Sequence, residues 1–225
     1  GLAMRVAVFD FGAMGQRATR MLLAKGVQIV AVIDPAPDLA QRVSQVFAHQ
    51  TTWPQVYAAL PDLAPLQLDV ALHTFATQLA DIESVALACA AARINVASIA
   101  EDAFEPFFQD ADLPIARRLD AAFRDARCSL IATGVQDNFL YQMPLALIRA
   151  CEQVTRVRIC NIADLSKLGP TVLQHLPLNA HPDDCREICE NASGQRFCFD
   201  VAARPLIRRL GRRVISAHNE IRLLV

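Results

Sequence analysis

The chain has 225 residues, a formal net charge of −1, 53% apolar residues and 20% charged residues. This composition is typical of a globular protein and excludes a disordered chain. A balanced charge offers no general attraction to nucleic acid or to an anionic membrane, so neither is expected as a partner. No charge-free apolar stretch of about 18 residues is present, which predicts neither a signal peptide nor a membrane span and favours a cytoplasmic location.

The seven cysteines are an odd number in a chain too long for a small disulfide scaffold. Several lie in apolar runs, so we expect buried free thiols in a reducing compartment. His181, Cys185 and Cys189 share one face of a predicted helix, with Cys198 further on. They lack the paired spacing of a zinc site, and we expect them to pack rather than to bind a metal.

The first part of the chain alternates short apolar runs with segments of helical periodicity. In chain order it predicts a strand at 5–9, a helix at 15–25, a strand at 27–33, a helix at 38–47, a short helix between prolines in 51–67, a strand at 68–74, a helix at 78–92, a strand at 95–99, a helix at 113–126 and a strand at 129–133. This alternation indicates a parallel sheet with helices on both faces, and we place the domain at 4–135.

The remainder, 136–225, changes character. It predicts an apolar helix at 139–150, a strand with one wet face at 154–162, a connector at 171–179, and helices at 182–191 and 200–210, with a further strand possible near the end. One convincing strand is thin for a sheet domain, because two strands alone are marginally stable. We therefore expect only a partial α+β domain in this part of the chain.

The stretch DFGAMG follows the first predicted strand and opens the first helix. A dinucleotide fingerprint has three glycines, for a tight turn, for backbone approach to the pyrophosphate and for helix–strand packing. Gly12 and Gly15 take the second and third roles, and Ala13 and Met14 lie between them. The amides and the positive end of the helix suit a phosphate, so we expect these four residues to bind a dinucleotide.

Asp34 ends the second predicted strand, 19 residues after Gly15. In this position a carboxylate accepts hydrogen bonds from the adenosine ribose and repels a 2′-phosphate, which favours NAD and leaves NADP possible. The alternative is a turn or helix-capping aspartate before Pro35.

Asp10 stands where the first glycine is expected. Aspartate tolerates the left-handed conformation better than most residues, so the turn can survive. A carboxylate within about 5 Å of a pyrophosphate repels it. We expect weakened binding, and a site that has lost its ligand is the competing interpretation.

The sequence HTFAT ends the fourth predicted strand. In such a sheet Thr74, Phe75 and Ala76 would lie beside the nicotinamide ribose. His73 has two interpretations, an acid or base at the strand end or a satisfied buried histidine, and the second is favoured.

Three later stretches, INVASIAEDAFEPFF, IATGVQDNFLYQMPLALIRACEQVTRVRICNIADLS and AHPDDCREICENASGQRFCFDVAARPLIRRLGRRVISAHNEI, resemble the 2,4-diaminopentanoate dehydrogenase and native amine dehydrogenase family. That family is related to dihydrodipicolinate reductase through its nucleotide domain. The resemblance implies a Rossmann-type doubly wound parallel sheet followed by a partial α+β substrate domain. It also implies a homodimer.

By this resemblance the protein would oxidise an amine carbon to an imine with NAD(P), and water would then give a ketone and ammonia, or the reverse. A carboxylate facing the amine suits that chemistry. The family's acidic residue maps to Glu101, with Asp102 and Glu105 close by. A solvated acidic loop is the alternative. Asn138 and Tyr141 would shape the pocket for an amine or ketone.

The sequence departs from the family at three places: at Asp10, in VQDNF, which lacks the family's proline and glycine, and at Val225, beyond which the family continues. Two other functions stay open. One is a dihydrodipicolinate reductase-like imine reductase, whose basic histidine and lysine motif is absent. The other is a non-catalytic dinucleotide-binding or assembly protein, which Asp10 favours.

Overall fold

The computed structural model describes residues 3–75, 78–108, 113–132, 138–158, 198–213 and 215–216. The chain divides into two compact units, Gly1–Val135 and Gln136–Val225. Each unit has its own buried residues, and each is described by itself below.

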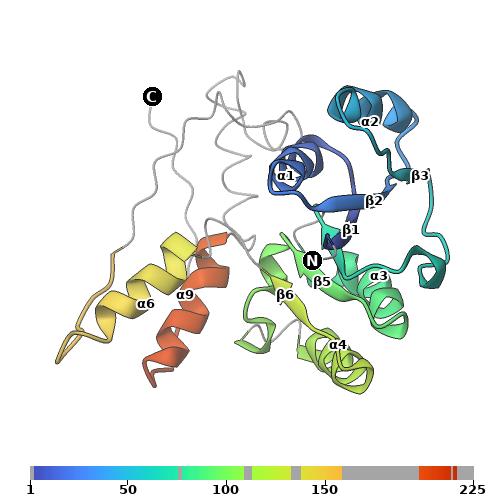
Figure 1. The fold of residues 1–225 in the computed structure, drawn as a ribbon. Coiled ribbons are helices and arrows are strands. Elements are labelled where there is room, and N and C mark those ends of the chain that lie inside the picture. Colours follow the sequence, from blue (N-terminus) through green and yellow to red (C-terminus); the bar gives the residue numbers. More distant parts are fainter. Residues whose placement is uncertain are drawn as a thin grey trace, which may run out of the picture. The chain divides into compact units, whose positions relative to one another are not determined.

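Six parallel strands form one sheet in the first unit (Figure 1). In chain order they are β1 (Arg5–Phe9), β2 (Gln28–Ile33), β3 (Gln55–Tyr57), β4 (Val70–His73), β5 (Asn95–Ser98) and β6 (Leu130–Ala132). Their order across the sheet, β3-β2-β1-β4-β5-β6, reverses direction between β1 and β4. That reversal is where an open α/β sheet leaves a ligand crevice. The prediction of a Rossmann-type doubly wound parallel sheet is confirmed.

Helices cover both faces of this sheet (Figure 1). Two of them, α1 (Ala13–Ala24) and α2 (Leu39–Phe47), pack with Val6 and Val8 of β1 in one apolar cluster. The other two, α3 (Leu79–Ala91) and α4 (Leu113–Ala126), pack with Ala7 and Phe9 in the second cluster. Alternate residues of β1 therefore serve opposite cores, as the period of a strand requires.

Part of the segment 51–67, where a short helix was expected, instead forms the edge strand β3. Gln55, Val56 and Tyr57 pair with Ala31, Val32 and Ile33 of β2. A short 3-10 helix, η1 (Ala64–Leu66), follows. Three residues are too few to show a period of two, so the strand is defined by pairing with β2 and not by its own pattern.

The second unit is described over two segments. The first contains a π-helical turn, η5 (Asn138–Gln142), and α6 (Met143–Ile148), and the second contains α9 (Cys198–Arg209). Buried residues from both segments form its core: Leu140, Tyr141, Leu145, Ile148, Ala202 and Leu206. The helices expected at 139–150 and 200–210 correspond to these elements.

The strand expected at 154–162 is wrong over the residues that the structure describes. Residues 154–158 are irregular, and 159–162 lie outside the described part. Alternation alone does not make a strand, because its backbone groups also need a neighbouring strand to pair with. The connector at 171–179 and the helix at 182–191 also lie outside the described residues.

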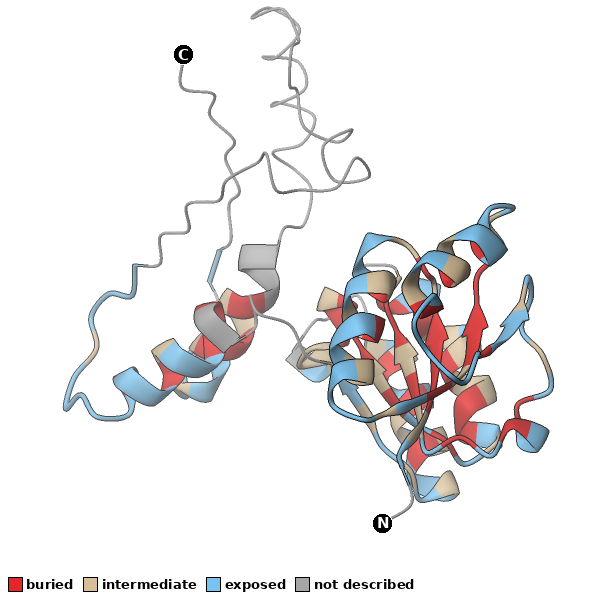
Figure 2. Ribbon diagram, turned by 45° about the horizontal axis from the view of Figure 1, so that its top comes forward, coloured by how far each residue is buried: buried red, intermediate tan, exposed pale blue. Residues whose placement is uncertain are grey.

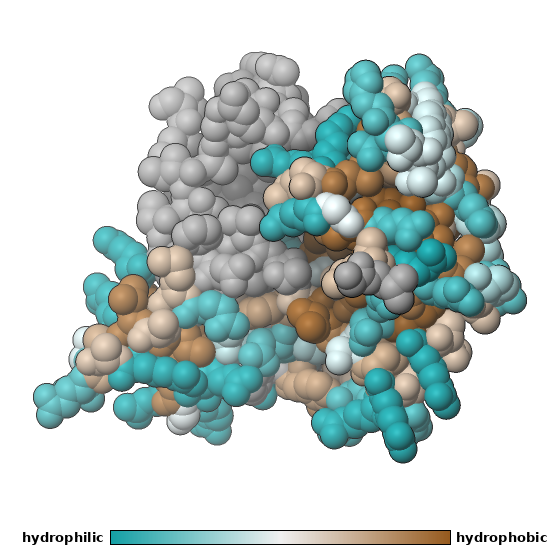
Figure 3. Space-filling view, in the orientation of Figure 1, coloured by the Kyte–Doolittle hydropathy of each residue, from teal (hydrophilic) through white to brown (hydrophobic). Residues whose placement is uncertain are grey.

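Burial follows the sheet and the inner faces of its helices (Figure 2). Hydrophilic side chains cover much of the visible surface, and apolar residues reach it between them (Figure 3). Trp53, Val56 and Leu60, on and beside β3, are among the exposed apolar residues. Among the described helices, none is long and apolar enough to cross a membrane.

Candidate nucleotide-binding site

The turn between β1 and α1 leads into a helix N-terminus whose first amides have no hydrogen-bond partner among the described residues. Gly12 is the N-cap and contributes no side-chain hydrogen bond. The first bond of the helix runs from the Gln16 amide to the Gly12 carbonyl at 3.0 Å, so the amides of Ala13, Met14 and Gly15 precede the helical ladder. Ala13 and Met14 are exposed. This is the arrangement that binds phosphates at the start of a helix.

Gly15 allows α1 to approach the end of β1 closely. A Cβ at this position would lie 2.2 Å from the Asp10 carbonyl oxygen and 2.8 Å from Thr74 Oγ1. Since no side chain fits there, glycine is required for helix–strand packing, as the fingerprint expects of its third glycine.

Asp10 adopts the left-handed conformation that a first glycine would adopt, with φ 68°. Its amide donates to the Ile33 carbonyl at 2.8 Å, which anchors the turn to β2. The adjacent Phe11 is fully buried in the cluster beneath α1 and α2, so it does not fill the turn. The backbone of the turn is thus preserved by a residue that tolerates positive φ.

The Asp10 carboxyl folds back over the turn. Its Oδ2 lies 3.2 Å from the position a Gly12 Cβ would take. Burial and the neighbouring Asp34 carboxylate raise the pKa of Asp10, and the Gly12 amide and the Arg42 charge lower it in part. A hydrogen bond with the Asp34 side chain also raises it. The Asp34 carboxylate therefore lies close enough to Asp10 to make ionisation of Asp10 less favourable than that of an isolated aspartate.

Asp34 is buried, with 3% of its surface exposed. Its Oδ2 accepts from the Phe11 amide at 2.7 Å, and its Oδ1 accepts from the Ala36 amide, also at 2.7 Å. The second bond closes a turn across Pro35. Both interpretations of Asp34 thus have a structural basis. The residue lies beside the turn, where a ribose contact is predicted, and it also supports the turn and the loop after β2 through its hydrogen bonds.

Arg42 of α2 contacts the turn after β1, the residue that follows β2 and the start of its own helix. Its Nη1 donates to the Phe11 carbonyl at 2.7 Å and lies 3.3 Å from Asp34 Oδ2, while its Nη2 lies 2.9 Å from Asp38 Oδ1. The sequence analysis missed this residue. The i,i+4 spacing of Asp38 and Arg42 could have indicated the ion pair, but not the contacts with the turn.

A hollow of about 400 Å³ opens beside the turn. Its wall is largely apolar and comes from the ends of β1 and β2, the loop after β3, the loop after β4, and α3. The lining residues are Phe9, Asp10, Ile33, Pro35, Ala58, Ala59, Leu60, Phe75 and Val85. An apolar slot with one acidic group suits a nucleoside, whose base is flat and whose ribose carries hydroxyls. The residues after β3 were missed because that strand was not predicted.

The three residues after β4 that were predicted to contact the nicotinamide ribose differ in their positions. Thr74 is buried, and its hydroxyl lies 2.6 Å from the Asp10 carbonyl and 3.0 Å from the Phe9 carbonyl, so its donor is used within the protein. Phe75 lines the hollow. Ala76 lies outside the described residues. Contact of these residues with a nicotinamide ribose stays a prediction.

His73 is fully buried between the rings of Phe9 and Phe75. Its Nε2 lies 4.0 Å from Cys89 Sγ, and its Nδ1 has no hydrogen-bond partner among the described residues. Burial lowers the pKa of His73 to about 4, so the ring is neutral near neutral pH. The favoured interpretation, a buried histidine, describes its position, although one ring nitrogen is not satisfied.

Glu101 begins a 3-10 helix, η2 (Glu101–Ala103), directly after β5, and a second one, η3 (Pro106–Phe108), follows. Glu101 is half-buried, whereas Asp102 is buried. Because all strands are parallel, the carboxyl ends of β1 and β5 meet the same edge of the sheet. Glu101 and the Gly12 turn therefore share the crevice edge, as expected.

Asn138 and Tyr141 belong to η5 in the second unit. Tyr141 is buried there, and its hydroxyl accepts from Arg209 Nε of α9 at 3.2 Å. The observed role of Tyr141 is thus to pack this helix pair. A role of either residue in binding substrate stays a prediction.

Three cysteines are free but not uniformly buried: Cys89 is buried, Cys128 is half-buried and Cys151 is exposed. The expectation of buried thiols is therefore wrong for Cys151. His181, Cys185 and Cys189 lie outside the described residues. Within the part of the chain that the structure describes, no group of metal-ligating side chains is found.

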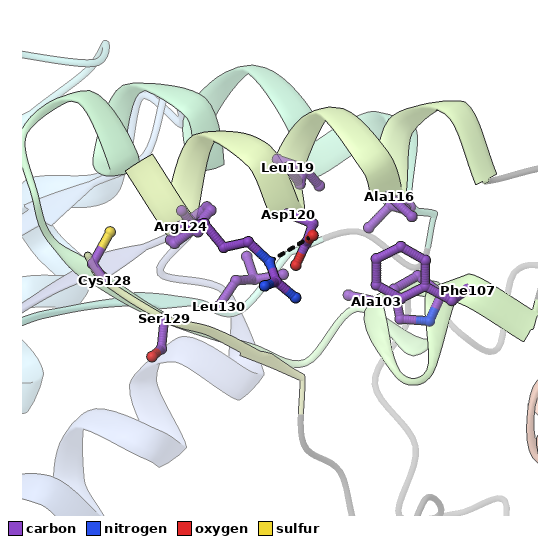
Figure 4. A pocket seen from close by; sticks show the side chains of 12 residues that line it. Ala103, Phe107, Ala116, Leu119, Asp120, Arg124, Cys128, Ser129 and Leu130 are labelled. Carbon is purple, nitrogen blue, oxygen red and sulfur yellow. Dashed lines mark hydrogen bonds and ion pairs between the residues drawn. The ribbon is translucent and has the colours of Figure 1, made fainter. Parts of the chain in front are cut away.

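A second hollow, of about 330 Å³, lies along α4 (Figure 4). Leu119, Phe123 and Phe107 contribute apolar walls, and Asp120 and Arg124 of α4, which form an ion pair at 2.8 Å, also line it. No residue of the β1–α1 turn lines this hollow. It is therefore distinct from the crevice at which Asp10 and Phe75 meet.

No family model and no curated protein matches the sequence. Among solved structures, the amine dehydrogenase from Mycobacterium smegmatis has a TM-score of 0.74 and 22% identity, over 95% of this chain and 63% of that one. The protein GenD2 from gentamicin A biosynthesis, solved with NAD, has a TM-score of 0.49 and 20% identity, over 67% of this chain and 40% of that one.

Scyllo-inositol dehydrogenase from Lactobacillus casei, solved with NAD(H) and scyllo-inositol, has a TM-score of 0.47 and 11% identity, over 66% of this chain and 41% of that one. This chain shares the fold of the amine dehydrogenase over 95% of its own residues and spans about 63% of the length of that protein.

Proposed function

We propose that the protein is an NAD(P)-dependent oxidoreductase, preferring NAD, that acts on a C–NH2 group. The observation that carries the proposal is the turn itself: unpaired amides of Ala13 and Met14 at the start of α1, beside an apolar hollow at the reversal of strand order. The fold likeness to an amine dehydrogenase, over 95% of this chain, supports the choice of substrate.

In this proposal the first turn of α1 binds the diphosphate through its backbone amides. The hollow lined by Pro35, Leu60 and Phe75 takes the adenosine half. A bound nicotinamide supplies the group that accepts or donates a hydride. The remaining residues position the cofactor and exclude water, which is the share of the chemistry that a protein contributes.

Glu101 is proposed to face the amine. The balanced reaction converts an ammonium substrate, NAD⁺ and water into a ketone, ammonium, NADH and a proton. The carboxylate holds the substrate ammonium and takes its proton before hydride leaves the adjacent carbon. Its place on the half-buried loop after β5, at the edge shared with the Gly12 turn, supports this role.

Two measurements test the proposal in order. NADH and NADPH are first titrated against the protein by fluorescence. A panel of ketones is then supplied with ammonium and NADH, and the loss of NADH is followed. Glu101→Gln is expected to lower kcat by at least about 100-fold with little change in NADH binding. Glu105→Gln, the same change four residues along the loop, is the matched control.

Nucleotide binding without turnover of any ketone or amine would support a second candidate, a non-catalytic nucleotide-binding protein. One observation favours it: the Asp10 carboxyl lies over the Gly12 amide, at the turn that the diphosphate would use. Failure of both nucleotides to bind would overturn the proposed function and this second candidate together.

A further inference from the structure

Two carboxyls lie at the ribose end of the turn, and only one of them lines the hollow. Both Asp34 oxygens accept backbone amides, and its side chain is almost completely buried. Asp10, not Asp34, is among the residues that line the hollow. The acidic group that a nucleoside would meet there is therefore Asp10, in the turn after β1.

We propose that Asp10 is a specificity-determining residue of the nucleotide site: its carboxyl meets the adenosine ribose and selects a nucleotide with free 2′ and 3′ hydroxyls over one with a 2′-phosphate. This inference rests on the proposed function. In a dinucleotide fingerprint the ribose is bound by the acidic residue after the second strand, which is Asp34 here. The oxygens of Asp34 already accept hydrogen bonds from the Phe11 and Ala36 amides, so the inference assigns the ribose contact to Asp10.

The charges around Asp10 support this selection. Asp34 at the end of β2 adds a second carboxyl, and Arg42 of α2 is engaged by Asp34 and Asp38. The Asp10 carboxyl also accepts a hydrogen bond from the Gly12 amide. A doubly negative 2′-phosphate would thus meet the Asp10 carboxyl, with the buried charge of Asp34 behind it and an arginine that is already paired, whereas ribose hydroxyls would find an acceptor in Asp10.

The size of the effect follows from Coulomb's law. A unit charge about 5 Å from a doubly charged phosphate, in water-like surroundings, weakens binding by roughly tenfold. Raising the pH removes the proton from the carboxyl pair and so strengthens the discrimination. Because burial and, to a lesser degree, Asp34 raise the pKa of Asp10, that change falls above the range of an isolated aspartate.

The experiment compares dissociation constants for NADH and NADPH, by fluorescence titration, in four proteins. Asp10→Asn keeps the shape and tolerates positive φ but removes the charge, and Asp10→Gly restores the fingerprint. Asp120→Asn removes the same charge from α4 and is the matched control. Both Asp10 variants are expected to reduce the preference for NADH roughly tenfold, and the control is expected to keep the wild-type ratio.

A pH series on the wild type and on Asp10→Asn adds a second arm. The preference for NADH is expected to increase with pH in the wild type as the Asp10 carboxyl loses its proton, and to change less in Asp10→Asn, where only the 2′-phosphate still titrates. A ratio in the Asp10 variants that equals the wild-type ratio at every pH overturns the inference and leaves the proposed function standing. If no protein of the set binds either nucleotide, both are overturned.

Discussion

The Thr74 hydroxyl lies 2.6 Å from the carbonyl oxygen of Asp10 and so joins the end of β4 to the turn that follows β1. It lies 3.0 Å from the Phe9 carbonyl as well, and the residue is buried. The two strands on either side of the crevice are thus tied together by one side chain. The shape of the turn depends on this contact as well as on its glycines.

Thr74→Val tests that connection. Valine keeps the volume and removes the hydroxyl that donates to the Asp10 carbonyl, so we expect a loss of about 1–2 kcal/mol in the free energy of unfolding, because a buried acceptor loses this partner. Urea denaturation measures it. Thr74→Ser, which retains the hydroxyl, is expected to lose less, and equal losses in the two variants would contradict the role of the hydroxyl.

Gly15→Ala is expected to be more disruptive. Its Cβ would lie 2.2 Å from a backbone oxygen, which cannot move independently of the turn. We predict a loss of about 1–3 kcal/mol in the free energy of unfolding and a loss of nucleotide affinity. Gly26→Ala is the control, because Gly26 has φ 77° and no atom near its Cβ position. The control should lose about 1–2 kcal/mol through backbone strain and keep its affinity.

Arg42→Met removes the charge that faces Asp34 and retains much of the apolar stem. The side chains of Arg42 and Asp34 are only 17% and 4% exposed, so the variant leaves a buried carboxylate with fewer partners. We expect a loss of about 3 kcal/mol in the free energy of unfolding, measured by urea denaturation. The same change at Arg124, whose ion pair with Asp120 lies at the surface, should be nearly neutral. Equal effects at the two sites would contradict the prediction.

His73 makes the stability of the fold sensitive to acid. Burial lowers its pKa from 6.5 to about 4, so the unfolded chain binds a proton at a higher pH than the folded protein does. Above pH 6.5 the residue contributes nothing to the pH dependence; as the pH falls from there to about 4, the free energy of unfolding declines by about 3 kcal/mol through this residue.

His73→Leu is expected to remove that part of the acid sensitivity. Urea denaturation of both proteins at several pH values between these limits gives the difference, and other titrating groups largely cancel in it. A difference that does not change with pH would show that the buried ring is not the group responsible.

Much of the first unit could be predicted from local pattern. Strands β1 and β2 are continuous apolar runs after their first residues, Arg5 and Gln28, and the helix α4 was predicted at its observed bounds of Leu113–Ala126. Such segments repeat over enough residues for their period to be read directly. The predictions failed for β3 and for 154–158, because pairing with another strand decides both outcomes and no local period reports it.

The residues of the candidate site were also predicted only in part from the sequence. The sequence by itself determined that glycines follow β1, that a helix begins there, and that acidic residues stand at positions 10, 34 and 101. These features depend on neighbours in the chain. Only the tertiary structure decided which carboxyl lines the hollow, that Arg42 joins Asp34 to the Phe11 carbonyl, and that Thr74 supports Asp10. Those contacts join residues far apart in sequence, and the direction of a side chain across a crevice is set by the packing of the elements around it.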